Sequence, residues 1–362
     1  MPDADQPPTV HLSGRGDVAA ALPQLIGFRP RESLVVVALR GATGLRVGLT
    51  ARVDLPAAEH RGPVLRELVR SLLTDGPAAV LLLVVSESDD DAAVPPAPGS
   101  AGPVAELPHR PLVHDAVLAF DAAGVAVREA VLVRRGRWWS YDCARGCCAP
   151  DVGTPLPGGT SPLAAAAALG GQVVEDDRAA LVRRIAPVGF LAAAGMAQAC
   201  DQVGDDLARR TAELGWDEVA EEGWAAVLAA VEAAGPARDG GGQRLSDREV
   251  ARLAWGLRDV DLRDRALALA LGDSAAAAES VWVDLTRRAP APLDAAPATL
   301  LAVTAWVRGD GALANVALAR ALDSEPGYTF AVLLRSALDA CVPPARIRRL
   351  IREAGVPRDA RR

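Results

Sequence analysis

Residues 45–55 alternate between apolar and polar or small side chains without a break, and this pattern restricts the possible fold more than any other in the chain. The apolar positions are Leu45, Val47, Leu49, Ala51, Val53 and Leu55, and the others are Arg46, Gly48, Thr50, Arg52 and Asp54. Successive side chains of a β-strand point to opposite faces, so a period of two predicts a strand with one buried face. We therefore expect a sheet with a core on at least one side.

The segments around this strand predict the rest of such a sheet. Residues 33–39 and 79–85 are continuous apolar runs of strand length, which is typical of strands buried on both faces. A loop bounded by glycines at 41 and 44 indicates a hairpin between 33–39 and 45–55. Further elements are expected as helices at 18–26, 64–73 and 112–122 and as strands at 10–12, 125–134 and 137–141. We predict an N-terminal mixed-sheet α/β domain over residues 1–155.

Residues 156–362 predict an all-helical domain. A turn-rich segment at 149–162 precedes it, and Ser161-Pro162 is a typical helix start. Gly272-Asp273 and Gly309-Asp310 recur with a spacing close to the roughly 34-residue period of tetratricopeptide repeats. We expect tetratricopeptide-like hairpins over about 262–342, with ordinary alanine-rich helices as the alternative, and a basic C-terminal tail at 343–362.

Arginine supplies all 39 basic side chains, because the chain contains no lysine. This excludes a P-loop lysine and a Schiff-base lysine. Recognition of a phosphate or carboxylate would fall to arginines, whose planar guanidinium binds such groups in a bidentate manner. The net charge of −7 argues against nucleic acid as a partner.

The sequence also bears on localisation. No apolar run is long enough to span a membrane, and the acidic, proline-rich first residues do not resemble a signal peptide. Five cysteines, three of them within residues 143–148, do not suggest a disulfide framework. We expect a cytoplasmic protein without a membrane partner.

Polar side chains surround the start of one predicted strand and the end of its neighbour. They are Arg29, Arg31, Glu32 and Ser33 before or at the start of 33–39, and Arg52 and Asp54 on 45–55. If the hairpin register brings these ends together, they form a pocket for an anion or for acid–base chemistry. The alternative is a structural pair between arginine and carboxylate at a sheet edge.

Residues 134–148 hold the densest concentration of reactive and aromatic side chains. Arg137 and Trp138 could stack on a planar ligand, although Trp138 and Trp139 should face opposite sides of a strand. Cys143, Cys147 and Cys148 follow, and their spacing is not that of paired zinc knuckles. Zinc with His109 or His114 as fourth ligand, a redox-active disulfide and inert reduced thiols all remain open.

Several motifs together carry a family resemblance. They are Leu12-Ser13-Gly14, residues 25–37 with Gly27, Phe28, Pro30, Glu32 and Ser33, Arg52-Val53-Asp54-Leu55-Pro56, residues 136–143 with Trp138, Trp139 and Tyr141, Cys147-Cys148, and Gly153-Thr154-Pro155. The chain resembles an uncharacterised, chiefly actinobacterial family, domain of unknown function 4192. The resemblance covers nearly the whole chain and implies no activity. Ala149 separates the cysteine pair from Pro150, where family members more usually have proline directly after the pair.

No nucleophile–base arrangement or metalloprotease pattern is readable from the spacing. We therefore expect a binding or regulatory protein, with a small-molecule or protein site on the α/β domain and a helical interaction domain. One alternative is a hydrolase or phosphate-handling enzyme that uses the same arginine and carboxylate residues. Another is an interaction module controlled by zinc or by cysteine oxidation. No cofactor is predicted beyond the possible zinc ion.

Overall fold

The computed structural model describes residues 14–41, 46–88, 106–143, 145–159, 161–169, 172–235 and 244–354. The chain divides into two compact units, an α/β unit that ends at Asp177 and a helical unit that begins at Arg178. The strand predicted at 10–12 and most of the predicted loop at 86–107 lie outside the described residues. In the described part of the chain, no helix has the length and apolar character needed to cross a membrane.

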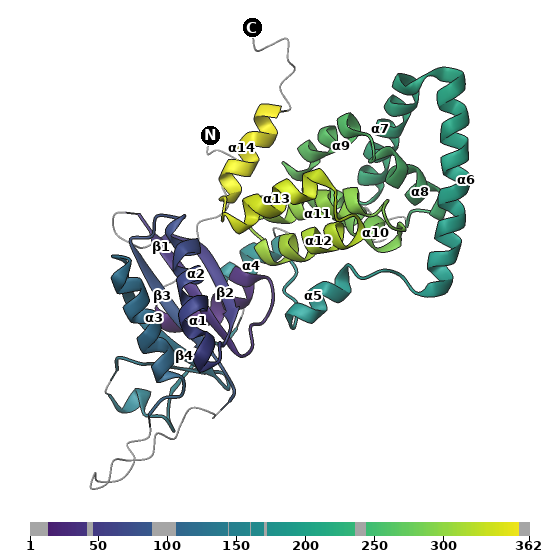
Figure 1. The fold of residues 1–362 in the computed structure, drawn as a ribbon. Coiled ribbons are helices and arrows are strands. Elements are labelled where there is room, and N and C mark those ends of the chain that lie inside the picture. The colour runs from purple at the N-terminus through teal and green to yellow at the C-terminus, as the bar shows by residue number, and fades with distance from the viewer. Residues whose placement is uncertain are drawn as a thin grey trace, which may run out of the picture. The chain divides into compact units, whose positions relative to one another are not determined.

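The α/β unit contains a six-stranded mixed sheet with the order β2-β1-β3-β4-β5-β6 (Figure 1). Its strands are β1 (Ser33–Arg40), β2 (Arg46–Asp54), β3 (Ala79–Val85), β4 (Ala126–Arg134), β5 (Arg137–Ser140) and β6 (Thr154–Pro155). Only the pair β3–β4 is parallel among these strands. The predicted α/β class with a mixed sheet is confirmed.

The predicted hairpin is also present, and its register places Ser33 opposite Asp54. The apolar face of β2 packs against the core through Leu49, Ala51 and Val53. Because β2 is the edge strand, none of its side chains is fully buried, and Val47 is 40% exposed. By contrast, β1 lies between β2 and β3 and is buried from Ser33 to Leu39, as its continuous apolar run predicts.

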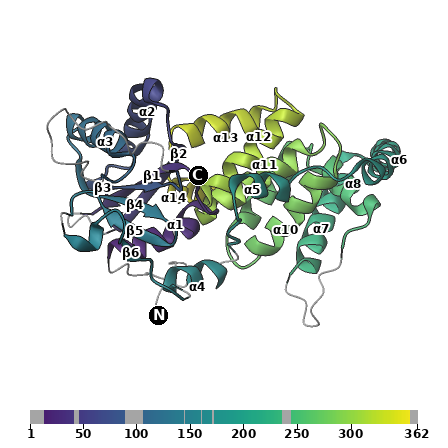
Figure 2. The ribbon, with the colours of Figure 1, turned by 90° about the horizontal axis from the view of Figure 1, so that it is seen from below.

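Helices cover both faces of the sheet. In Figure 2, α2 (Arg61–Leu73) and α3 (Arg110–Ala122) lie on one side and α1 (Arg15–Ile26) on the other. Alternate strand residues, including Leu34, Leu82 and Leu132, pack with the apolar faces of α2 and α3. Helix α1 begins earlier than predicted, because Gly14 and not Asp17 is the N-cap.

The segment after the sheet stays with the α/β unit. Helix α4 (Pro162–Leu169) contacts α1, and the side chain of Gln172 donates to the carbonyl oxygen of Gln24. A single β-bridge joins Phe28 to Glu175. Residues 161–169 and 172–177, which the sequence predicts as part of the helical domain, therefore belong to the α/β unit.

The helical unit consists of helices packed in pairs. The helices are α5 (Arg178–Arg184), α6 (Phe190–Leu214), α7 (Trp216–Ala233), α8 (Asp247–Gly256), α9 (Val260–Ala266), α10 (Ala275–Arg288), α11 (Ala295–Arg308), α12 (Gly311–Ser324), α13 (Thr329–Asp339) and α14 (Pro344–Ala354). Helix α11 is buried from Ala295 to Val307 and packs against α10 and α12, so it forms the centre of the unit.

The turns of this unit use local hydrogen bonds that the sequence specifies. Gly309 ends α11 in the left-handed conformation, and the Asp310 carboxylate caps α12 by accepting from the Leu313 N–H.

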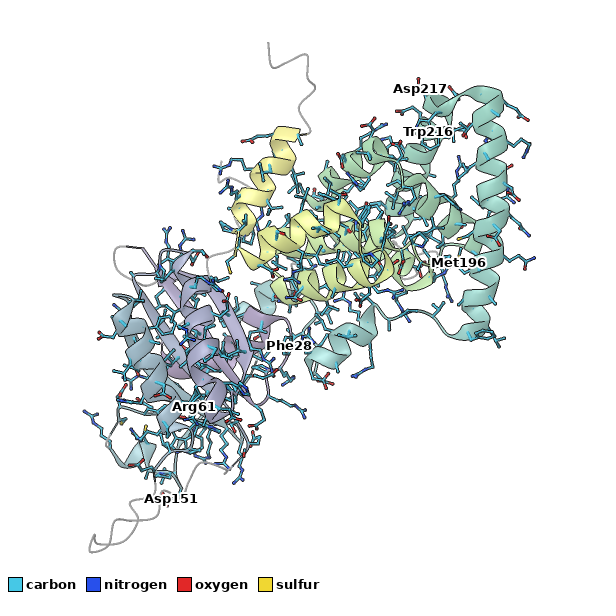
Figure 3. All side chains as sticks on the ribbon, in the orientation of Figure 1. Phe28, Arg61, Asp151, Met196, Trp216 and Asp217 are labelled. Atoms are coloured by element: carbon cyan, nitrogen blue, oxygen red, sulfur yellow. The ribbon has the colours of Figure 1, made fainter. Side chains whose placement is uncertain are left out.

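On α6, Met196 is buried, whereas Trp216 at the start of α7 is partly exposed (Figure 3). The predicted all-helical class is confirmed as a set of packed helix pairs.

Candidate functional site

Most of the polar side chains that the sequence predicts as a pocket lie at one end of the strands of the sheet. Strand β1 begins there, and β2, β3 and β4 end there, because Ser33 lies opposite both Asp54 and Val85, and Val85 pairs with Val133. This is the edge at which the parallel strands β3 and β4 present their carboxyl ends. Such an edge is the usual place for ligands in α/β sheets.

A buried hydroxyl holds the arginine of β2 in place. Ser33 is fully buried, and its Oγ donates to the carbonyl oxygen of Arg31 at 2.6 Å. The same Oγ accepts from Nε of Arg52 at 2.8 Å, and the guanidinium lies 5.8 Å from the ring centre of Phe28. The guanidinium of Arg52 is therefore held by Ser33, by the Arg31 carbonyl and by the Phe28 ring.

Arg52 in turn positions a carboxylate. One terminal nitrogen of Arg52 lies 2.6 Å from Oδ1 of Asp54, whose side chain is 84% exposed, while that of Arg52 is only 17% exposed. Arg52 is thus an internal support, and Asp54 is the partner that faces solvent. The predicted convergence of Ser33, Arg52 and Asp54 is present in the structure.

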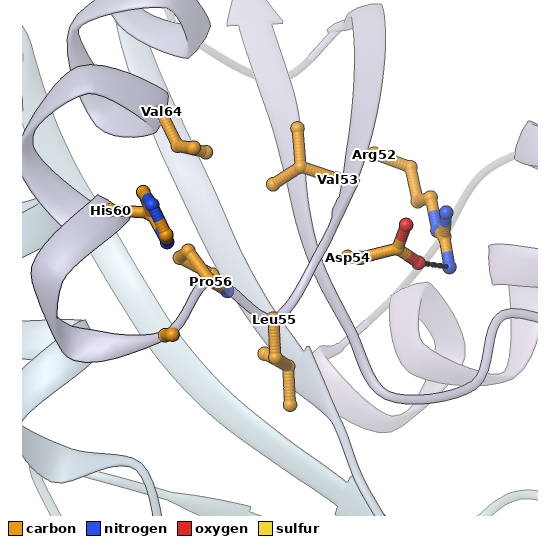
Figure 4. Close-up of a pocket in the computed structure, with 8 residues that line it drawn as sticks. Arg52, Val53, Asp54, Leu55, Pro56, His60 and Val64 are labelled. Atoms are coloured by element: carbon orange, nitrogen blue, oxygen red, sulfur yellow. Dashed lines mark ion pairs between the residues drawn. The ribbon is translucent and has the colours of Figure 1, made fainter.

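An open pocket of about 420 Å³ lies beside this ion pair (Figure 4). It is lined by Arg52, Val53, Asp54, Leu55, Pro56, Ala57, His60 and Val64. Its wall is apolar except for the ion pair and His60, whose side chain is 72% exposed. The pocket is shallow and open to solvent, so a ligand there would be only partly enclosed.

Glu32 lies at the same edge but turns toward another strand. Its backbone is left-handed, with φ of 39°, and its carboxylate accepts from the Ser86 hydroxyl at 2.7 Å and from the Glu87 N–H at 2.7 Å. The backbone carbonyl of Glu32 accepts from the Leu55 N–H. Glu32 therefore ties β1 to the end of β3 and does not join Arg52 in the pocket.

This contact extends into a buried chain of hydrogen bonds. Oγ of Ser86 lies 3.0 Å from Nε2 of His109, the residue before α3, and both side chains are buried. A serine, a histidine and a glutamate thus meet, but the carboxylate binds the serine and not the histidine. A Ser–His–Asp triad has the opposite order, with the carboxylate on the histidine. Ser86 is also only 1% exposed, so these hydrogen bonds hold the ends of β1, β3 and α3 together and leave no accessible nucleophile.

The other predicted ligand residues lie elsewhere. Arg29 is paired weakly with Asp176, at 3.8 Å between Nε and Oδ1. Arg137 donates to the carbonyl oxygens of Val152 and Gly153, and so holds a turn beside β5. Trp138 is on β5, which β3 and β4 separate from β1. Arg31 contributes its carbonyl oxygen, and its side chain is exposed.

The three clustered cysteines form a second group. The Sγ atoms of Cys143, Cys147 and Cys148 all lie within 4.8 Å of one another. The 3-10 turn η2 (Gly146–Cys148) follows β5 and carries two of them. Cys148 is buried and Cys147 is exposed. The sequence offered His109 or His114 as a fourth ligand, but His109 is hydrogen-bonded to Ser86, and among the described residues neither histidine joins the three sulfur atoms.

The thiols of Cys143 and Cys148 differ in acidity. Burial raises the pKa of the Cys148 thiol to about 11. A hydrogen bond from the Arg145 backbone N–H, together with the neighbouring Cys148 thiol, lowers the pKa of Cys143 below the ordinary thiol value. The Cys143 thiol therefore ionises at a lower pH than the Cys148 thiol.

Comparison with known proteins gives a family. No curated protein matches the chain, and no solved structure does. A family model described as Domain of unknown function (DUF4192) matches residues 16–345. The match includes both the sheet edge with its pocket and most of the helical unit. The chain therefore belongs to the family Domain of unknown function (DUF4192).

Proposed function

We propose that the chain is a cytoplasmic binding protein whose α/β unit takes a small organic ligand in the pocket beside β2. The observation that carries the proposal is the division of roles between Arg52 and Asp54. Ser33 and the Arg31 carbonyl hold the guanidinium, and the guanidinium holds a carboxylate that is 84% exposed at the pocket wall. A polar group fixed in this way before binding costs little entropy when a ligand arrives.

The lining indicates the chemistry of the ligand. Asp54 offers a carboxylate acceptor on one side of β2, while Val53, Pro56 and Val64 offer an apolar surface on the other. A molecule that carries a cationic or strongly donating group on an apolar body meets both requirements. His60 is a further polar residue of the lining, and it lies on the other side of β2 from the Asp54 carboxylate.

The placement of the polar residues favours binding over catalysis. A phosphate-handling site built on Arg29, Arg52 and Arg137 would need these guanidiniums at one point, and they contact Asp176, Asp54 and the turn at Val152 respectively. A hydrolase built on Ser86 would need an accessible hydroxyl, and this one is buried and donates to Glu32. Both observations support a receptor for a ligand.

The helical unit is proposed to contact a protein partner through tetratricopeptide-like hairpins. The packing of α11 against α12 across the Gly309 turn supports this likeness, since small residues such as Ala302 and Ala314 are fully buried in this pair. Helical hairpins that stack in this way provide extended binding surfaces.

Benzamidine is a suitable probe for the pocket, because it joins a planar amidinium to an apolar ring. Its affinity for the full-length chain would be measured by calorimetry, together with the variants Asp54→Asn and Asp121→Asn. Asp121 is an exposed carboxylate at the end of α3, at the opposite edge of the sheet, and serves as the matched control. A charge-assisted hydrogen bond is worth about 1.5–3 kcal/mol, so Asp54→Asn should weaken binding at least about tenfold. Equal affinity in all three proteins, or no binding to any, would contradict the proposal.

A further inference from the structure

The cysteine cluster has the spacing of a metal site that is almost closed. Sγ of Cys143 and Sγ of Cys147 are 3.9 Å apart, and all three sulfur atoms lie within 4.8 Å of one another. Two thiolates on one tetrahedral zinc ion lie about 3.8 Å apart, given a zinc–sulfur distance of about 2.3 Å. Small side-chain rotations therefore suffice to bring three sulfur atoms around one ion.

The backbone around the cluster is held independently of any metal. The Cys148 N–H donates to the Arg145 carbonyl and closes the turn, and the Ser140 N–H donates to Sγ of Cys148 at 3.3 Å. Backbone donors to ligating sulfur atoms are the usual outer contacts of metal–thiolate sites, where they orient the ligand. The sulfur of Cys148 is thus already oriented in the absence of an ion.

Two buried aromatic residues also hold the segments next to the cysteine turn by hydrogen bonds. The buried Trp139 donates from Nε1 to the carbonyl oxygen of Ala149 at 2.9 Å. The buried Tyr141 donates its hydroxyl to the carbonyl oxygen of Pro108 at 2.6 Å. These hydrogen bonds tie Trp139, Tyr141 and Ala149, on both sides of the cluster, to the α/β unit, and Cys147 is exposed to solvent.

The donor set fixes the class of ion and leaves one position open. In the part of the chain that the structure describes, only Cys143, Cys147 and Cys148 gather in this way, so the protein supplies three thiolates. Thiolates select soft or borderline ions such as Zn²⁺ and Cu⁺. Zinc sites with three protein ligands keep the fourth position for water or a small ligand.

We propose that Cys143, Cys147 and Cys148 bind one thiophilic d¹⁰ metal ion through three thiolates, with the fourth position open to an external ligand. This site does not depend on the pocket at Asp54 and goes beyond the proposed binding function. On binding, each thiol loses its proton to solvent, so metal uptake releases protons and strengthens as the pH rises.

The test uses the full-length chain, reduced and handled without oxygen. Zn²⁺ and Cu⁺ are titrated separately in competition with a chromophoric chelator, for the natural chain and for the variants Cys147→Ser and Cys341→Ser. Cys147 is exposed, so its replacement should leave the fold intact, and Cys341 in the helical unit is the matched control. Thermal unfolding with and without metal accompanies each titration, because an ion that binds the native state raises its stability.

The expected result is one equivalent of Zn²⁺ or Cu⁺ per chain, at least a tenfold loss of affinity in Cys147→Ser, and no loss in Cys341→Ser. The ratio of the two affinities indicates the coordination geometry of the site, since a trigonal site without an external ligand favours Cu⁺ and a four-coordinate one favours Zn²⁺. Binding well below one equivalent, or equal affinity in Cys147→Ser and the natural chain, would overturn the proposal. So would a metal-induced rise in melting temperature that persists in Cys147→Ser.

Discussion

The two units of this chain place their charged side chains in different environments. In the helical unit, carboxylates are buried between helices, as Glu279 is between Arg184 and Arg308. In the α/β unit, the buried Ser33 and the largely buried Arg52 hold the exposed carboxylate of Asp54. A buried and fully paired charge holds helices in register, whereas an exposed carboxylate on a buried support remains available to a ligand.

The largest effect should come from the helical unit. Glu279→Ala removes a carboxylate that is 5% exposed, so Arg184 and Arg308 both lose their ion pair with it. Breaking a buried ion pair on one side costs roughly 3–5 kcal/mol, and partial exposure of the arginines places this case near about 3 kcal/mol. Urea unfolding followed by circular dichroism measures the change. The exposed Glu213→Ala on α6 is the control and should stay within about 0.5 kcal/mol.

A smaller loss is expected from Gly153→Ala in the α/β unit. Gly153 has φ of 62°, and an added Cβ would lie 2.4 Å from the ring of the buried Trp139. Strain and overpacking together should cost about 2–3 kcal/mol. Gly159→Ala separates the two causes, since Gly159 has φ of 86° and no atom near its Cβ position. If thermal unfolding shows equal losses for both variants, Trp139 does not pack against this turn as described.

Ser33→Ala should destabilise the α/β unit by about 1–2 kcal/mol, because the buried hydroxyl serves both the Arg31 carbonyl and Nε of Arg52. The exposed Ser280→Ala, whose hydroxyl donates to the Ala276 carbonyl, should change little. The same variant releases Arg52 and with it Asp54, so benzamidine should bind more weakly to Ser33→Ala than to the natural chain. Unchanged affinity would mean that Ser33 does not support the pocket.

The smallest effect is a dependence on pH in the helical unit. Burial raises the pKa of Asp294, which is fully buried beside Arg320 and Ser324. A raised carboxyl pKa means that the folded state binds the proton more tightly, so the contribution of Asp294 to stability falls as the pH rises from the ordinary carboxyl pKa to the raised one. Asp294→Asn removes this pH-dependent contribution to the free energy of unfolding. Unfolding free energies across acidic pH should therefore show a smaller deficit for Asp294→Asn as the pH rises, and a constant deficit would contradict the raised pKa.

Much of the fold was predictable because it depends on local patterns. Strand β3 has the bounds of its apolar run, and the alternation in β2 identifies the side that packs on the core. The pairing of β1 with β2 follows from the short loop between them. This pairing alone brings Ser33, Arg52 and Asp54 together, so this part of the candidate site could be inferred from the sequence.

The rest of the candidate site depends on features that leave no local signal. Glu32 turns away from Arg52 because its backbone is left-handed, and nothing in its residue type predicts this conformation. His109 reaches Ser86 only because α3 begins beside the end of β3. Strand order separates Trp138 from β1, and sequence spacing does not specify strand order across a sheet.

The proposed ligand pocket depends on Asp54, which Arg52 holds in place. Its most direct test is a benzamidine titration of the isotope-labelled full-length chain, followed residue by residue by nuclear magnetic resonance. We expect the saturating shifts to concentrate on Val53, Asp54, His60 and Val64, and Asp54→Asn to abolish this pattern at the same benzamidine concentration. Shifts confined to residues outside this pocket, or an unchanged pattern in Asp54→Asn, would contradict it.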